Sequence, residues 1–275
     1  MRCLLVSDLH YTLRQFDWVL NQADTCDVVV IAGDHLDIAS AVDFQAQITV
    51  IVTYLRRLRA RTQVIVCSGN HDLDAQNEAD EKFARWILKL RQFDVPTDGD
   101  SLERNGTLFT VCPWWDGPVA CQSVAEQLER DSTREKARWV WVYHAPPDES
   151  PTSWGGRQSF GDSQLTQWIR QFQPDMVLTG HIHQSPFKSG GSWADRIGAT
   201  WVFNPGRQIG PTPTHVILDT QERRAFWSSL AGMEQVCLDQ DLMRPIPALE
   251  RPPPWLIGTN RDSAGNPACG PRSAD

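Results

Sequence analysis

Short runs of consecutive apolar residues alternate along the chain with longer stretches in which apolar residues recur every three or four positions. The runs are typical of strands buried on both faces of a sheet, and the periodic stretches are typical of amphipathic helices. Helices are predicted over residues 41–58, 83–90 and 165–172, the last with Asp162 or Ser163 as its N-cap. Strands are predicted over residues 4–6, 28–32, 64–67, 108–112, 139–143, 176–178, 201–203, 215–218 and 224–228.

The order of these elements indicates an α/β protein. Strand–helix–strand units dominate the first half and strands dominate the second half, a mixture that predicts a sandwich of two sheets flanked by helices. From Pro245 onward, proline, glycine, serine and asparagine replace the apolar pattern. We therefore expect one domain over residues 1–244 and a Pro/Gly-rich, disordered tail over residues 245–275.

The net charge of the 275-residue chain is −8, whereas proteins that bind nucleic acid polymers usually carry a basic patch or stripe. The one dense basic run, from Arg56 to Arg61, lies at the end of a predicted helix, where cations complement the helix dipole. The acidic balance therefore argues against a nucleic acid polymer as partner. It does not exclude a small phosphate ester, because bound metal ions would dominate the local field.

Cysteine usage and the N-terminal segment bear on the cellular setting. The seven cysteines show no C-x-x-C spacing, which argues against a disulfide framework or a cysteine zinc site and fits a reducing, cytoplasmic environment. The first apolar run is short and ends in Asp8 and His10, so it predicts a strand and not a signal peptide. No stretch approaches the ~18 apolar residues of a membrane span, and we expect no membrane association.

Polar motifs directly follow five of the predicted strands, at the edge where ligands bind in open α/β sheets. Their side chains include carboxylates, an amide and imidazoles, which are ligands for manganese, iron and zinc. Each motif alone is a weak signal, but together they contain most of the seven histidines and predict a pair of metal ions. The motifs are Ser7-Asp8-Leu9-His10, Gly33-Asp34-His35-Leu36-Asp37, Gly69-Asn70-His71-Asp72, His144-Ala145-Pro146-Pro147 and Gly180-His181-Ile182-His183.

This ordered set of motifs resembles the calcineurin-like metallophosphoesterase superfamily, and the strand pattern extends the resemblance to about residue 230. The resemblance implies a four-layer α/β/β/α sandwich of two mixed sheets flanked by helices. It also implies two divalent transition-metal ions, bridged by an aspartate and a hydroxide. One departure is minor, since the family often has glycine where this chain has Tyr143.

The resemblance also implies roles for individual residues, position by position. His71 matches the non-ligand histidine that faces the phosphate or the leaving group, and Asp37 matches the acid that orients it. Asp72 matches the acid that closes the third motif, although it could instead cap the following helix. The implied ligands of the first ion are Asp8, His10, Asp34 and His183, and those of the second ion are Asp34, Asn70, His144 and His181, with Asp34 bridging.

Other residues are candidates for substrate contact. Trp114 could stack on a base or an aromatic ester, or it could pack under a helix. Arg157 lies in a long loop after His144, and Arg207 follows the strand at residues 201–203, so both are candidate contacts for a phosphate. His35, inside the second motif, is expected to face solvent.

The sequence therefore predicts a di-metal phosphoesterase that hydrolyses a small-molecule phosphodiester through attack of metal-bound hydroxide on phosphorus. The closest likeness is to class III cyclic-nucleotide phosphodiesterases. Alternatives are a phosphomonoesterase, a nuclease, and a non-catalytic metal-binding scaffold of the same fold. The acidic balance argues against the nuclease, and the complete set of motif residues argues against the scaffold. Motifs for a serine nucleophile elbow, a Walker loop or a dinucleotide-binding turn are absent from the sequence.

Overall fold

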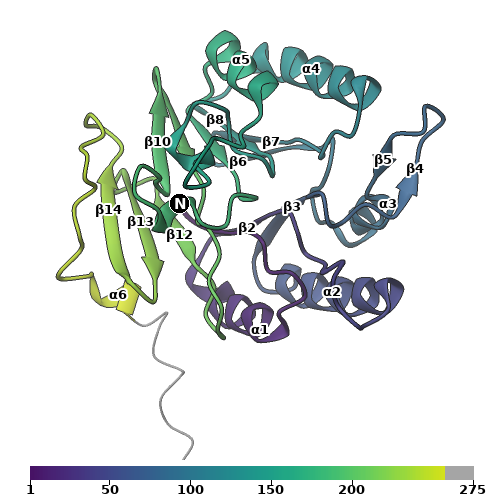
Figure 1. Cartoon of the computed structure of the whole chain (residues 1–275), viewed down its shortest axis with the longest axis horizontal. Coiled ribbons are helices and arrows are strands. Elements are labelled where there is room, and N and C mark those ends of the chain that lie inside the picture. The colour runs from purple at the N-terminus through teal and green to yellow at the C-terminus, as the bar shows by residue number, and fades with distance from the viewer. Residues whose placement is uncertain (258–275) are drawn as a thin grey trace, which may run out of the picture.

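The computed structural model describes residues 1–257 and contains two six-stranded mixed sheets (Figure 1). The first sheet consists of β14 (Gly232–Cys237), β13 (Arg224–Ser229), β12 (His215–Asp219), β1 (Arg2–Val6), β2 (Val28–Ala32) and β3 (Gln63–Cys67), in that order. The second sheet consists of β10 (Ala194–Ile197), β11 (Thr200–Phe203), β9 (Met176–Leu178), β8 (Arg138–Val142), β7 (Thr107–Val111) and β6 (Ser101–Arg104), in that order.

An apolar core joins the two sheets. Leu5 and Val30 of the first sheet pack in one buried cluster with Val142 and Phe203 of the second sheet. Side chains alternate between the two faces of a strand, so Leu4 points to the opposite face and packs in a different cluster. Burial on both faces explains why these strands are continuous apolar runs.

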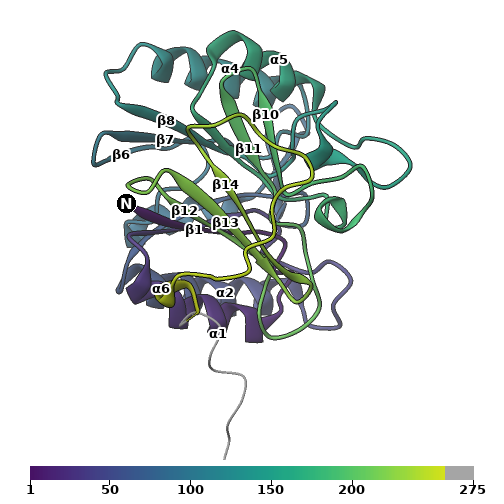
Figure 2. The same ribbon diagram turned by 90° about the vertical axis from the view of Figure 1, so that its left-hand side faces the viewer.

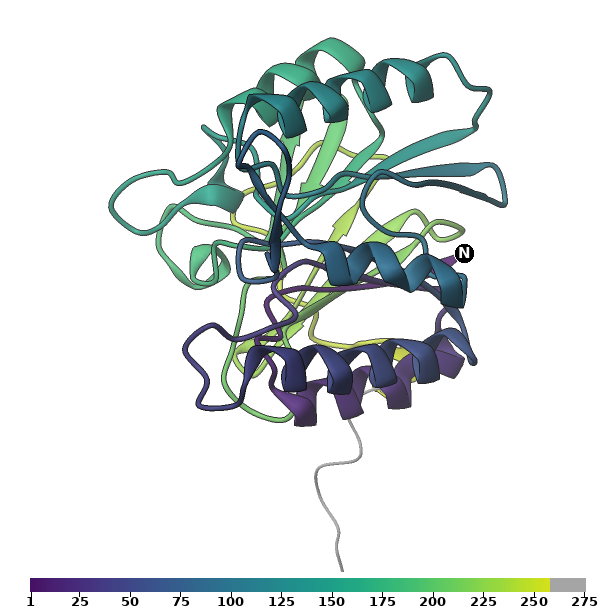
Figure 3. The same ribbon diagram turned by 90° about the vertical axis from the view of Figure 1, so that its right-hand side faces the viewer.

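Helices cover both outer faces, and the molecule has four layers in the order α/β/β/α (Figure 2, Figure 3). α1 (Leu13–Gln22), α2 (Phe44–Arg59) and α3 (Arg85–Leu88) pack on the first sheet, and α4 (Pro118–Ser132) and α5 (Ser163–Phe172) pack on the second. This arrangement confirms the predicted fold class. The shorter elements are η1 (Ala23–Thr25), β4 (Ala75–Gln76), β5 (Lys82–Phe83), η2 (Lys89–Phe93), η3 (Pro151–Ser153), η4 (Ser185–Phe187) and α6 (Pro254–Ile257).

The strands that precede the polar motifs run parallel to one another within each sheet. β1, β2 and β3 pair in parallel in the first sheet, and β7, β8, β9 and β11 do so in the second. Parallel strands end at the same edge of a sheet, so the segments that follow them are brought together there. The topology therefore gathers motifs that are far apart in the sequence.

The basic run at the end of α2 is engaged within the molecule. Arg59 forms an ion pair with Asp94, and Arg61 forms an ion pair with Asp24. The Arg56 guanidinium lies over the ring of Phe93. All three of these arginines therefore have partners within the molecule.

Residues 245–257 pack on the first sheet, although proline-rich composition predicts a disordered tail from residue 245. The Gln235 N–H donates to the Pro247 carbonyl, and the Leu249 N–H donates to the Met233 carbonyl. Leu256 is only 1% exposed and belongs to the core cluster under α1 and α2. The rest of the predicted tail, residues 258–275, lies outside the described residues, and the domain boundary at residue 244 stays a prediction.

We expect Leu256→Ala to lower the free energy of unfolding by about 2–4 kcal/mol, because it removes a buried side chain and leaves a cavity. Chemical denaturation measures the change. Leu230→Ala is the matched control, since Leu230 is 77% exposed and its loss should change stability by under about 0.5 kcal/mol. Equal, small effects of the two substitutions would show that the segment does not pack on the domain in solution.

Candidate metal centre

The five motif-bearing segments meet at one edge of the sandwich, and four of them form two groups of potential metal ligands. Asp34 belongs to both groups. Each residue of a group offers one ligand atom, and these atoms all lie within 4.8 Å of one another. The first group contains Asp8, His10, Asp34 and His183, and the second contains Asp34, His144 and His181.

Asp8 and Asp34 are buried carboxylates, with exposed fractions of 0% and 1%. Their nearest basic groups are imidazoles. His183 Nε2 lies 3.1 Å from Asp8 Oδ1, and His144 Nε2 lies 3.2 Å from Asp34 Oδ2. Over residues 1–257, no lysine or arginine pairs with either carboxylate. Buried charges of this kind are stable only when they are paired or bind a metal.

The pKa values of two neighbouring histidines shift in opposite directions. Burial lowers the pKa of His144, but Asp34 and Asp8 outweigh it and raise the pKa to about 9. Burial and the charge of His144 lower the pKa of His181 to about 4. Burial raises the pKa of Asp34, yet His144 brings it below its usual value overall. The two carboxylates therefore favour positive charge beside them, which a metal ion can supply.

Hydrogen bonds to the backbone orient two of the imidazoles. His144 Nδ1 lies 2.7 Å from the Ala32 carbonyl oxygen, and His10 Nδ1 lies 3.3 Å from the Leu36 carbonyl oxygen. Each of these nitrogens can donate its hydrogen, which leaves Nε2 with a lone pair, the arrangement usual for metal-binding histidines. Asn70 Oδ1 is buried without a hydrogen-bond partner, and His144 Nε2 is buried 3.2 Å from the Asp34 carboxylate. These buried atoms and the N/O donor set fit a transition metal.

Four of these residues have a left-handed backbone conformation. The φ angles are 56° at Asp8, 41° at His10, 54° at Asp34 and 67° at His181. A residue other than glycine in a sparsely populated region costs about 1–3 kcal/mol and persists where the surroundings over-determine it. Strain gathered at one cluster of polar side chains is a mark of a functional site.

Two of the segments exchange hydrogen bonds through their carboxylates. Asp34 Oδ1 accepts from the His71 N–H at 2.9 Å. In return, Asp72 accepts from the His35 and Leu36 N–H groups at 3.0 and 3.1 Å. Asp72 Oδ2 also lies 3.0 Å from His35 Nδ1. The two segments are therefore locked together around Asp34.

These hydrogen bonds give His35 and Asp72 structural roles that were not predicted from the sequence. His35 is fully buried, so the expectation that it faces solvent is wrong. Asp72 binds the neighbouring segment instead of capping a helix. No local pattern could reveal the pair, because Asp72 contacts a segment that is distant in the sequence.

His71 lies at the first group. Its Nε2 is 3.9 Å from Asp34 Oδ2, and its ring is 4.5 Å from that of His10. The structure does not bring Asp37 to it. The Asp37 carboxylate accepts from the Ala39 N–H at 2.9 Å, a local turn bond common for aspartate, while His71 Nδ1 is without a hydrogen-bond partner. The catalytic roles of His71 and Asp37 stay predictions.

The three candidate substrate contacts differ in their position. The half-buried Trp114 ring lies 5.3 Å from the His181 ring and 5.8 Å from the His144 ring. Arg207 Nε donates to the Asp8 carbonyl at 3.0 Å. Arg157 is exposed and contacts none of the candidate ligands in the described part of the chain.

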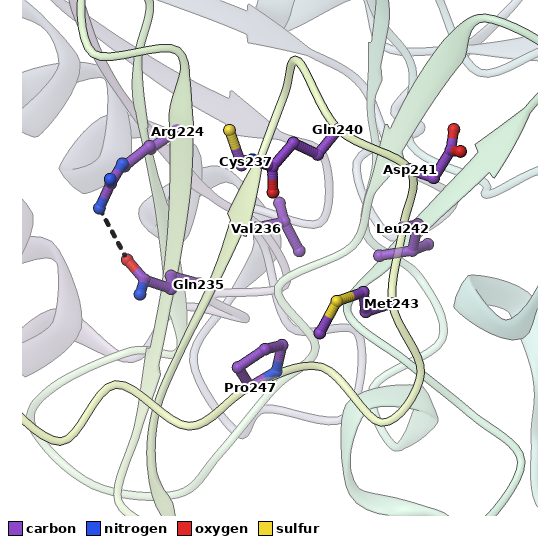
Figure 4. Close-up of a pocket in the computed structure, with 9 residues that line it drawn as sticks. All are labelled: Arg224, Gln235, Val236, Cys237, Gln240, Asp241, Leu242, Met243 and Pro247. Atoms are coloured by element: carbon purple, nitrogen blue, oxygen red, sulfur yellow. Dashed lines mark hydrogen bonds between the residues drawn. The ribbon is translucent and has the colours of Figure 1, made fainter.

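A separate cavity of about 210 Å³ lies beside the edge strand β14 (Figure 4). Arg224 and Gln235 form one wall and are joined by a hydrogen bond, and Val236, Leu242 and Met243 supply apolar surface. None of the candidate ligands lines this cavity, so it is not part of the metal centre.

A sequence model described as calcineurin-like phosphoesterase matches residues 1–185. That range covers about two thirds of the chain and includes every candidate ligand. The chain belongs to the calcineurin-like phosphoesterase family. Membership in this family supports phosphoester hydrolysis as the chemistry of the site. Among curated proteins, no sequence matches the chain significantly, and no helix within residues 1–257 is long and apolar enough to cross a membrane.

Solved structures share this calcineurin-like fold at low sequence identity. The protein TT1561 of Thermus thermophilus is 15% identical with a TM-score of 0.55, over 86% of this chain and 98% of that one. A purple acid phosphatase, PPD1 from yellow lupin, is 10% identical with a TM-score of 0.51, over 87% of this chain and 52% of the phosphatase. At these identities the likeness supports the fold alone.

We expect Gly69→Ala to abolish tight metal binding in this phosphoesterase. An added Cβ would lie 2.2 Å from Asp34 Oδ1 and 2.5 Å from the Asp34 backbone nitrogen, so the shared ligand would have to move. Elemental analysis of the purified variant measures the loss. Gly198→Ala is the control, because its Cβ meets no atom within 4 Å; its φ of +61° adds backbone strain but leaves the ligands in place. Retention of full metal content by Gly69→Ala would contradict the position assigned to Asp34.

Proposed function

We propose that the chain hydrolyses a small-molecule phosphodiester and uses two divalent ions, of manganese, iron or zinc. The observation that carries the proposal is the sharing of Asp34 between two adjacent groups of ligand atoms. An aspartate has two oxygens, so one side chain can serve both ions. When bound, such ions lower the pKa of water and stabilise negative charge on phosphoryl oxygens. The seven proposed ligands are Asp8, His10, Asp34, Asn70, His144, His181 and His183.

The position of His71 supports a role as the acid that protonates the leaving oxygen. Its side chain is 24% exposed beside the buried Asp34, so a substrate can reach it while the carboxylate lies beneath. General acid help of this kind typically contributes ~10²–10⁴-fold to a rate. No hydrogen bond to Asp37 is needed for this role.

Trp114 supports the preference for a diester. A diester carries a second organic substituent, and the half-buried indole beside His144 and His181 offers an apolar, aromatic surface for it. Arg207, anchored to the Asp8 carbonyl, is proposed to contact the phosphate with its outer nitrogens. Arg157 is exposed and has less support.

The choice between diester and monoester is tested directly with nitrophenyl esters. Protein loaded with Mn²⁺ should hydrolyse bis-p-nitrophenyl phosphate at least about tenfold faster, in kcat/KM, than p-nitrophenyl phosphate, a difference of about 1.4 kcal/mol in the barrier. Asp34→Asn is the control and should lose both activities. A preference for the monoester would replace the proposal with a phosphomonoesterase, and no hydrolysis by metal-loaded protein would favour a scaffold.

We expect His71→Gln to retain both metal ions and to lose activity according to the leaving group. Glutamine cannot donate a proton as imidazolium does, and a ribose oxygen needs that proton far more than p-nitrophenolate does. Rates on a cyclic nucleotide should fall ~10²–10⁴-fold, with a smaller fall on the nitrophenyl diester. Equal losses on both substrates would indicate that His71 positions the phosphate, and loss of metal would place it among the ligands.

A further inference from the structure

One buried amide connects three of the segments that surround the candidate metal centre. Asn204 directly follows β11 and has an exposed fraction of 0%. Its Nδ2 donates to the Thr152 carbonyl at 2.9 Å, to the Ile182 carbonyl at 3.2 Å and to Ser185 Oγ at 3.1 Å. Its Oδ1 accepts from the Gly206 N–H at 2.9 Å. Asn204 lies beyond the residues that the family model matches.

The turn that begins at Asn204 also contacts residues of the first ligand group. The Arg207 N–H donates to the His183 carbonyl at 3.0 Å, and Arg207 Nε donates to the Asp8 carbonyl at 3.0 Å. Gly206, with φ of +69°, lies so close that an added Cβ would be 2.8 Å from the His183 carbonyl oxygen. The turn therefore fixes the backbone of two ligands of the first group.

The residues of the second group are held by hydrogen bonds that do not involve the turn. The His181 N–H donates to both oxygens of Asp8, at 3.1 and 3.0 Å. The Gly180 N–H donates to the His144 carbonyl at 2.8 Å. His183 lies farther along the same segment. Its backbone is held by the Arg207 N–H, and the Asn204 side chain binds the carbonyl of the preceding residue, Ile182. Loss of Asn204 should consequently loosen His183 more than His181.

We infer that Asn204 is a positioning residue for the first metal ion, acting through His183 and, by way of Arg207, through Asp8. Side chains that orient metal ligands typically change metal affinity by about 10–100-fold when they are removed. Asn204 makes no hydrogen bond to His144 or His181, whose segments are held by the Gly180–His144 backbone bond and by the Asp8 carboxylate. The inference rests on the proposed pair of ions but not on their catalytic use.

Titration of chelator-treated protein with Mn²⁺ by calorimetry tests this role. Wild-type protein should bind two ions, and His183→Ala identifies which binding step belongs to the first group. In Asn204→Ala, that step should weaken at least about tenfold while the other stays within about threefold. The inference would be overturned if both binding steps weakened equally, or if neither step weakened.

A control separates positioning from a general loss of stability. Gln127 is an equally buried amide that donates to the Asp100 and Val111 carbonyls, away from every candidate ligand. Gln127→Met should lower the melting temperature and leave both Mn²⁺ affinities unchanged. An equal weakening of the first step in Gln127→Met would overturn the specific role of Asn204.

A milder variant keeps the inference testable if Asn204→Ala does not fold. Ser185→Ala removes one acceptor of the amide and the bond from Ser185 Oγ to the Ile182 carbonyl, so the same step should weaken by a smaller factor. An unchanged first step in Ser185→Ala would then overturn the inference. Wild-type protein that binds two ions but hydrolyses no phosphate ester would refute only the proposed function, because the titration does not depend on turnover.

Discussion

The burial of Asp8 and Asp34 at one edge of the sandwich is the constraint that shapes the whole site. Two carboxylates withdrawn from water without a lysine or arginine partner are costly, and the imidazoles around them compensate only in part. Much of the surrounding structure keeps this arrangement in place. Left-handed backbone at Asp8, His10, Asp34 and His181 adds strain of about 1–3 kcal/mol per residue. A bound cation would relieve the electrostatic cost, so metal binding and stability of this edge should be coupled.

The double sheet provides the rigidity that such a site requires. Parallel strands of the two sheets direct their following segments to one edge, and hydrogen bonds between those segments then set the details. Asp34 and Asp72 each accept N–H groups from the other's segment, and Asn204 joins the segments that follow β8, β9 and β11. Ligand positions are therefore determined by backbone hydrogen bonds between segments more than by the ligands' own strands.

Nine of the twelve strands of the two sheets could be predicted from the sequence, and the family resemblance implied how the ligands group. The strands β6, β10 and β14 and the hydrogen bonds between the segments of Asp34 and Asp72 could not be predicted. Strands buried on both faces, such as β2, are unbroken apolar runs and were predicted with their observed bounds. α4 escaped prediction because it buries only Val124 and Leu128 among its apolar residues, which leaves little periodicity. Asp72 and Asn204 bind backbone groups of distant segments, and the His35 ring binds the Asp72 carboxylate. Sequence spacing cannot identify such partners. The expected orientation of His71 by Asp37 stays a prediction. The Asp37 carboxylate accepts from the Ala39 N–H, and His71 Nδ1 has no hydrogen-bond partner among the described residues.

The proposed centre is built around Asp34, which we place between two metal ions. Anomalous X-ray diffraction from crystals grown with Mn²⁺ is the decisive experiment for this placement. We expect two anomalous peaks on either side of the Asp34 carboxylate, roughly 3.5–4 Å apart, one beside Asp8, His10 and His183 and the other beside Asn70, His144 and His181. A single peak, or peaks that leave Asp34 bound to one ion or to none, would contradict the bridging position.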